Sequence, residues 1–221
     1  MAAAALGEAR GVTIGSRVTH LGLSASVPCS DELLGRVIDA RGKPIDQGGR
    51  PVEGPSVHRP IYGDAPDPLS RRLIDTPLYT GLRAIDGMTT LGRGQRIGIM
   101  AGAGVGKSTL LGTIAQRSDA DVNVIALIGE RGREVGEFIH RILSEEARKR
   151  TVLVVATSDQ SPLDRVRGAF VATAIAEHFA DSGKHVLLMM DSLTRFAMAQ
   201  RELGLSMGVP PTTRGYTPAV F

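Results

Sequence analysis

Runs of apolar residues alternate with amphipathic segments through the second half of the chain. Four runs, at residues 96–100, 122–128, 151–156 and 185–190, have the length and composition of buried strands. Between them, apolar side chains recur at one-face helical spacing, at positions 135, 138, 139 and 142 and again at 166, 169, 170 and 173. This alternation predicts an α/β fold in which helices cover both faces of a parallel sheet.

The first part of the chain has a different pattern. Short β-strands are predicted at residues 12–14, 17–21 and 33–38, followed by a turn at 40–44. These strands are too few to close a barrel, so the segment is either incomplete at its N-terminus or pairs with something else. We expect the first case, with residues 1–61 as a partial N-terminal β-barrel domain. Six prolines, the last at Pro77, predict an extended Pro-rich linker at 62–78, and the α/β domain should occupy 79–221.

Composition narrows the class of protein. The 221 residues are 42% hydrophobic and only 4% aromatic, with no Trp, which suits aliphatic α/β layers better than a base-stacking surface. The net charge of +3 is spread along the chain, so no nucleic-acid partner is predicted. A single cysteine, Cys29, excludes an internal disulfide and fits the cytoplasm, and no apolar run reaches the roughly 18 residues of a membrane helix.

The candidate chemistry begins directly after the first apolar run. Residues 101–108 match the P-loop pattern except that Ala101 replaces its first glycine, and good helix formers follow at 110–116. Backbone N–H groups at such a helix start face phosphate, which predicts a site for ATP with Mg²⁺. The expected nucleotide-binding residues are Gly102, Ala103, Gly104, Val105, Gly106, Lys107, Ser108 and Thr109. A glycine-rich turn with a solvated lysine is the alternative.

Asp191 is the predicted second element of the metal site. It ends the run at 185–190 and so lies at the carboxyl edge of the sheet, where ligands bind in open α/β folds. We expect Ser108 to ligate Mg²⁺ directly, with Asp191 acting through a water. Asp191 could instead cap the helix that starts near residue 193.

Glu130 is the predicted catalytic base, because it follows the run at 122–128 and reaches the same sheet edge as the P-loop. Arg131 is predicted to contact the γ-phosphate, and Glu134 to favour the start of the next helix. In an isolated loop, a solvated ion pair would be the simpler interpretation. The five histidines lack metal-ligand spacing, and the basic residues at 148–150 suggest a solvated helix end.

Several motifs together resemble a known family. These are GLRAIDG from Gly81, AGAGVGKST from Ala101, GERGREV from Gly129, MDSLTRFAMAQ from Met190 and PPTTRGY from Pro210. They are similar to motifs of the ATPases of type III secretion and flagellar export, which belong to the superfamily of F-type ATPase catalytic subunits. The LGRVID stretch from Leu34 resembles the end of that family's N-terminal β-barrel.

The resemblance implies a RecA-like P-loop core in a homohexameric ring, cytoplasmic and peripheral at the inner membrane. It makes Glu130 the catalytic carboxylate, Arg131 a phosphate-side residue and Arg195 a neighbour of the site. The stretches from Val152 and Arg165 look more like injectisome than flagellar enzymes. Family members continue past Phe221 with an arginine finger and adenine contacts, so the chain is expected to be a fragment incomplete at both ends.

The implied function is ATP hydrolysis that energises type III protein export, through chaperone release and unfolding of secreted substrates. Implied partners are export chaperones, secreted substrates, stalk or stator proteins and export-gate proteins. A flagellar export ATPase is one alternative. A non-catalytic ring subunit should lack a carboxylate at position 130, where this chain has Glu130. An RNA-translocating helicase should add an RNA-binding domain that bears aromatic residues, so the sequence favours neither alternative.

Overall fold

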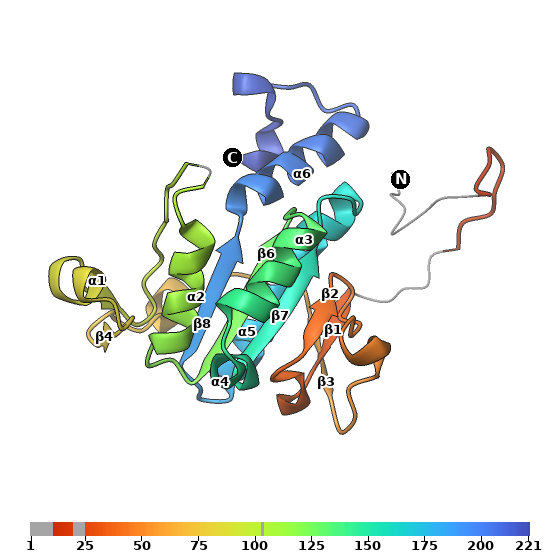
Figure 1. Cartoon of the computed structure of the whole chain (residues 1–221). Helices are drawn as coiled ribbons and strands as arrows, with labels where there is room; N and C mark the ends of the chain where they lie inside the picture. The colour runs from red at the N-terminus through yellow and green to blue at the C-terminus, as the bar shows by residue number, and fades with distance from the viewer. Residues whose placement is uncertain (1–10, 20–24, 103) are drawn as a thin grey trace.

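A four-stranded parallel sheet forms the centre of the computed structural model, which describes residues 11–19, 25–102 and 104–221 (Figure 1). The strand order is β2-β7-β6-β8. The strands are β2 (Val37–Asp39), β6 (Val122–Ile128), β7 (Thr151–Ala156) and β8 (Val186–Asp191), and every pairing between them is parallel. The predicted α/β class is confirmed, and so are three of the four strands predicted in the second half of the chain, at 122–128, 151–156 and 185–190.

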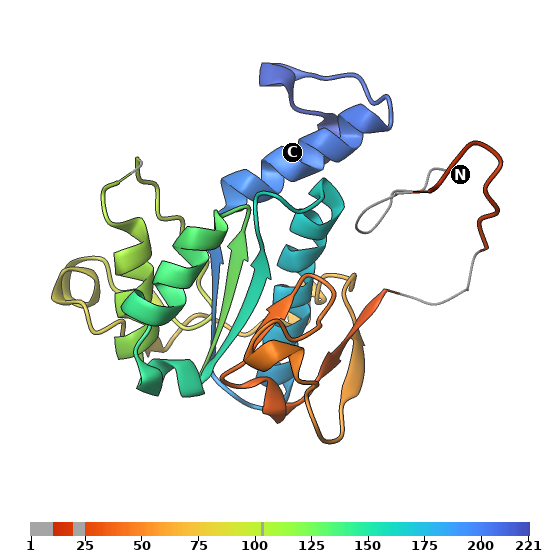
Figure 2. The ribbon, with the colours of Figure 1, turned by 45° about the vertical axis from the view of Figure 1, so that its right-hand side comes forward.

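Helices cover the two faces of this sheet (Figure 2). One face packs against α2 (Lys107–Arg117), α3 (Gly132–Glu137), the π-helical turn Phe138–Ile142 and α4 (Glu145–Lys149). The other face packs against α5 (Pro162–Asp181). Side chains of β7 alternate accordingly, with Leu153 in the first core and Val152 and Val154 in the second. The long α6 (Leu193–Ser206) continues from the carboxyl end of β8.

The N-terminal part of the chain is divided between two sheets. β1 (Ser26–Cys29) pairs antiparallel with β3 (Val57–Pro60), whereas β2 joins the central sheet at the edge of β7. A second small pair consists of β4 (Pro77–Leu78) and β5 (Leu91–Gly92) beside α1 (Arg83–Met88). Because β2 belongs to the central sheet, the strand pairing does not test the predicted domain boundary between residues 61 and 62, which stays a prediction. Short 3-10 turns complete the chain at Asp31–Leu33, Gln47–Gly49, Pro68–Ser70, Thr213–Gly215 and Pro218–Val220.

Four predicted strands need correction. Residues 12–14 are exposed and form no strand. In the strand predicted at 17–21, residues 17–19 form no strand, and residues 20 and 21 lie outside the described residues. The strand predicted at 33–38 is wrong for its first half, because Asp31–Leu33 is a 3-10 turn. The strand in this region is Val37–Asp39. Residues 96–100 are also not a strand, because among the described residues none pairs with them.

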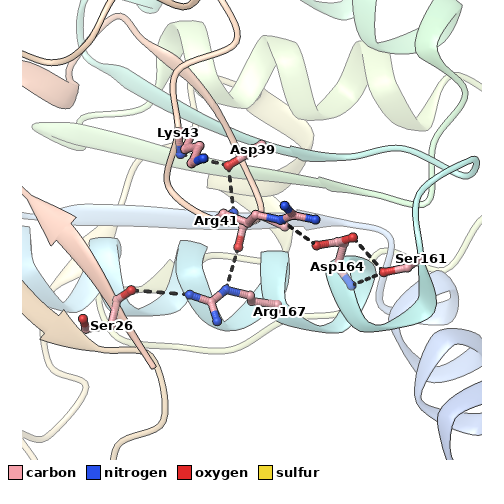
Figure 3. A network of polar contacts seen from close by, with 8 residues as sticks. Ser26, Asp39, Arg41, Lys43, Ser161, Asp164 and Arg167 are labelled. Carbon is pink, nitrogen blue, oxygen red and sulfur yellow. Dashed lines mark hydrogen bonds and ion pairs between the residues drawn. The ribbon is translucent and has the colours of Figure 1, made fainter. Parts of the chain in front are cut away.

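Polar contacts fasten the N-terminal segment to the start of α5 (Figure 3). Arg41 Nε lies 3.4 Å from Asp164 Oδ1, and Asp164 is buried. The hydroxyl of Ser161 caps α5, accepting a hydrogen bond from the Asp164 amide at 3.1 Å. Arg167 Nε donates to the carbonyl of Ala40 at 3.1 Å. The turn after β2 is thus held against the helix that covers the second face of the sheet.

None of the helices in the described part of the chain combines the length and the apolar character that a membrane crossing requires.

Candidate active site

Helix α2 begins at the predicted phosphate-binding lysine. Gly104 and Gly106 have φ of 77° and 92°, a region that glycine adopts freely, and Gly106 is the residue before the helix. A Cβ at either position would meet no atom within 4 Å, so the loop borders open space. Gly102, Val105 and Thr109 are exposed, and Ala103 lies outside the described residues. This arrangement leaves the first N–H groups of α2 free to face an anion.

Lys107 meets the carboxylate predicted to hold the metal. Its ammonium forms an ion pair with Oδ1 of Asp191, whose side chain is only 3% exposed at the end of β8. Asp191 does not cap the following helix. The hydroxyl of Ser192 accepts from the Arg195 amide at 3.4 Å and caps α6 instead. The alternative structural role for Asp191 is therefore wrong, and its buried carboxylate faces the start of α2.

Glu130 follows the end of β6 on the same side of the sheet. Its backbone carbonyl accepts from the Ser158 amide at 3.0 Å, so the loops after β6 and β7 are bound together. Burial raises the pKa of Glu130 to about 7, helped by the hydrogen bond with Glu134 and by the negative charge of Asp191, while Lys107 opposes the rise. A carboxylate that titrates near neutral pH is suited to accepting a proton from water.

Glu134 has two roles, one of which was predicted. Its Oε2 accepts from the backbone N–H of Arg131 at 3.3 Å, which supports the start of α3 as expected. Its side chain also bonds to Glu130, and this hydrogen bond lowers the pKa of Glu134. Of the two carboxyl groups, Glu130 is therefore the one in which the protonated form is favoured, and Glu134 the one in which the ionised form is favoured. The four-residue spacing of Glu130 and Glu134 across the start of α3 was the sequence signal for this second role.

A pocket of about 190 Å³ lies between these elements. Its polar lining consists of Ser108, Glu130, Glu134, Glu137 and Asp191, and Leu127, Val135, Phe138 and Ile142 form its apolar wall. The predicted metal ligands and the predicted base thus open onto one space beside the start of α2. With one lysine against several carboxylates, this space has an excess of negative charge that favours a cation.

The two arginines lie at the margin of the site. The side chain of Arg131 is 72% exposed and lies 4.0 Å from Glu134. Arg195 packs against the end of β6, where a Cβ on Gly129 would come within 2.7 Å of the Arg195 Cβ. Gly129 also has φ of 72°, so this close approach requires glycine there. These contacts do not assign a phosphate contact to either arginine, so the roles of Arg131 and Arg195 stay predictions.

The described residues contain no group of three or more His, Cys, Asp or Glu side chains arranged to hold a metal. The donors that do meet at the pocket, the Ser108 hydroxyl and the Asp191 carboxylate, are oxygens. Mg²⁺ prefers oxygen ligands and usually keeps several waters and phosphate oxygens beside one or two protein ligands. The residues present therefore fit Mg²⁺ brought in with a nucleotide better than a resident metal ion.

Comparison with known proteins decides the family. Residues 81–221 match the model of the ATP synthase alpha/beta family, nucleotide-binding domain. The chain belongs to this family. It is 55% identical over 218 residues to the type 3 secretion system ATPase of Xanthomonas euvesicatoria, covering 99% of this chain and 49% of that relative. It is 53% identical to the flagellum-specific ATP synthase of Treponema pallidum, covering 97% of this chain and 47% of that relative.

Solved structures agree with the fold. The assembled ATPase EscN of the enteropathogenic E. coli type III secretion system matches with a TM-score of 0.90 at 48% identity, over 97% of this chain and 52% of that one. EscN has also been solved in complex with its central stalk EscO, and that structure matches with a TM-score of 0.84. The resemblance read from the motifs is confirmed. The chain spans about half the length of the curated relatives it matches.

Proposed function

We propose that this chain binds MgATP at the start of α2 and takes part in ATP hydrolysis that energises type III protein export. The observation that supports this most directly is a pocket beside the start of α2 that is lined by Glu130 and Asp191, with Lys107 paired to Asp191. A phosphate-binding lysine, a metal-side carboxylate and a carboxylate that titrates near neutrality are the parts needed to hydrolyse a phosphoanhydride. The family membership and the names of the relatives agree with this reading.

Each side chain has a distinct task in this proposal. The N–H groups after Gly104 and Gly106 bind the β-phosphate, and Lys107 leaves Asp191 to neutralise the β- and γ-phosphates. Ser108, directly, and Asp191, through a water, would hold Mg²⁺, which would supply charge neutralisation at the phosphates. Glu130 orients the attacking water and accepts its proton, with Arg131 and Arg195 as neighbours on the phosphate side.

Assembly and location belong to the same proposal. By analogy with assembled EscN and its stalk complex, we propose a homohexamer that engages a central stalk protein. Export chaperones, secreted substrates and export-gate proteins are further proposed partners, with the ring in the cytoplasm at the inner membrane. A flagellar export ATPase is the second candidate, because a flagellar relative is almost as similar as the injectisome one.

The phosphate-binding role is tested with Lys107→Ala. Loss of the Lys107 ammonium should weaken MgATP binding. It should also lower turnover by roughly 10³-fold or more, because no cation then offsets the negative charge that develops on the phosphates. Nucleotide titration and phosphate release measure the two effects, with Lys184→Ala, an exposed lysine after α5, as the matched control. Near-normal turnover in Lys107→Ala would exclude the proposed site.

The proposed base is tested separately with Glu130→Gln. The amide still hydrogen-bonds water and Glu134 but cannot accept a proton, so hydrolysis should fall by about 10²-fold or more while binding survives. Glu146→Gln, at a carboxylate that is 90% exposed, is the control. An equal loss of binding and turnover would mean that Glu130 supports the fold rather than the chemistry.

A further inference from the structure

The carboxyl end of α2 is bound by an arginine from a distant part of the chain. The guanidinium of Arg150 donates to the carbonyls of Ala115 and Gln116, each at 3.0 Å, and of Ser118 at 3.1 Å. It also donates to the carbonyl of Ala120. The sequence suggested a solvated helix end for this residue, and that prediction is wrong. Arg150 is half-buried and closes the end of the helix that begins at Lys107.

Arg150 is itself held by the amino ends of β6 and β7. Its carbonyl accepts from the Asn123 amide at 2.8 Å. The Asn123 side chain donates to the same Ala115 carbonyl at 2.9 Å and to Thr151 Oγ1 at 3.3 Å. Asn123 and Thr151 are fully buried. The hydrogen bonds of Asn123, Arg150 and Thr151 therefore join α2 to the sheet at the edge opposite the pocket.

The chemistry of Arg150 suits this position. The last four carbonyls of a helix have no partner within it, and the helix dipole places negative charge there. A guanidinium offers five N–H donors in a planar fan and keeps its charge, so one side chain can serve several carbonyls at once. A lysine has three donors on a single atom and cannot span the same set.

The opposite end of α2 has fewer constraints. Its 11 residues form a rigid rod of about 16 Å. At its start, the preceding loop is exposed and the Lys107 contact with Asp191 must open when phosphate binds. Where Lys107 and Ser108 lie therefore depends on the apolar packing along the helix and on the anchor at its far end.

We propose that Arg150 is a positioning residue for nucleotide binding, which acts by fixing α2 along its axis and so placing Lys107 and Ser108. The inference rests on the proposed function, because the ligand is the phosphate of MgATP. It assigns a role to a residue that lies at the opposite end of α2 and is not among the residues that line the pocket.

The test compares Arg150→Ala and Arg150→Lys with Arg167→Ala. Arg167 is also half-buried and also binds backbone carbonyls, those of Ala40 and Ser26, but it lies on α5 away from α2. A fluorescent MgATP analogue is titrated into each variant, and hydrogen exchange of α2 amides is measured without nucleotide. Arg150→Ala should bind roughly tenfold more weakly, because small displacements of a binding group are costly.

Arg150→Lys should recover part of that affinity, and Arg167→Ala should stay within about twofold of the wild type. Exchange in α2 should accelerate in Arg150→Ala and not in Arg167→Ala. Wild-type affinity in Arg150→Ala would overturn the inference, and so would an equal loss in Arg167→Ala. If Arg150→Ala does not fold, wild-type affinity in Arg150→Lys overturns it. A wild-type chain that binds no analogue would instead refute the proposed function.

Discussion

Strand β7 and residues 96–100 have similar apolar sequences and different fates. All six residues of β7 are buried, and the strand pairs with β6 along its whole length and with β2 at residues 153–155. In residues 96–100, Ile97 is 49% exposed and Met100 is 96% exposed, and only Ile99 packs against the core. One segment stabilises the sheet, whereas the other leads into the loop that is proposed to bind phosphate.

The difference shows that an apolar run predicts burial but does not by itself supply a strand partner. A strand inside a parallel sheet needs a neighbour on each side, because unpaired backbone groups are costly to bury. β7 has two such neighbours. Among the described strands, β8 is at the edge of the sheet, and residues 96–100 do not pair with it. Residues 96–100 lead into the loop before α2, and β8 ends at Asp191, which pairs with Lys107 at the start of α2.

Leu153→Ala should have the largest effect on stability. This side chain is fully buried in β7 and belongs to the core beneath α2. Removing it should lower the free energy of unfolding by about 2–5 kcal/mol, through lost transfer energy and the cavity left behind. Denaturant melts followed by circular dichroism measure the change. A loss below about 1 kcal/mol would mean that β7 is no more constrained than the exposed segment.

The sequence predicted the interior of the sheet better than its edges. The runs at 122–128 and 151–156 match β6 and β7 residue by residue, because strands buried on both faces are apolar throughout. The addition of β2 to β7 was missed. The partner residues, Val37 and Leu153, are far apart in the chain, and three residues of parallel pairing leave no local signal. The role of Arg150 was missed for the same reason, since its partners belong to a distant helix.

The candidate site was predicted in its residue types and only partly in its geometry. The motif spacing identified Lys107, Glu130 and Asp191. In the structure Glu130 and Asp191 line one pocket, and Lys107 forms an ion pair with Asp191 beside it. The sequence could not show that the hydrogen bond between Glu130 and Glu134 shifts their pKa values in opposite directions, because this depends on burial and on the direction of both side chains. Nor could it show that Arg131 is largely exposed.

The pH dependence of stability should distinguish the candidate site, which contains a carboxyl group of raised pKa, from the apolar core. The pKa of Glu130 is raised from 4.5 to about 7, so the folded state favours the protonated form. Its contribution to stability is fully present below pH 4.5 and is lost as pH rises through 7. Glu130→Gln mimics the protonated form and should therefore be the more stable protein at about pH 8, by roughly 1 kcal/mol after allowing for solvent screening.

Thermal melts of wild type and Glu130→Gln at about pH 5 and pH 8 test this, with an expected difference of roughly 2–4 °C that grows with pH. Glu146→Gln should show no such growth, because its carboxylate is 90% exposed. A Glu130→Gln difference that is equal at both values would show that the neutral form is not favoured by the fold.

Met100→Ala should have the smallest effect, and it tests the comparison most sharply. Because Met100 is 96% exposed, its truncation should change the free energy of unfolding by less than about 0.5 kcal/mol. If residues 96–100 instead pair with the free edge of β8 in solution, Met100 or its neighbour Ile97 would be buried there. Truncating the buried side chain would then cost about 2 kcal/mol or more. Denaturant melts of Met100→Ala and Ile97→Ala beside Leu153→Ala distinguish the two cases. A large loss in either variant would show that residues 96–100 form the predicted strand, so that the sheet extends to the proposed phosphate-binding loop.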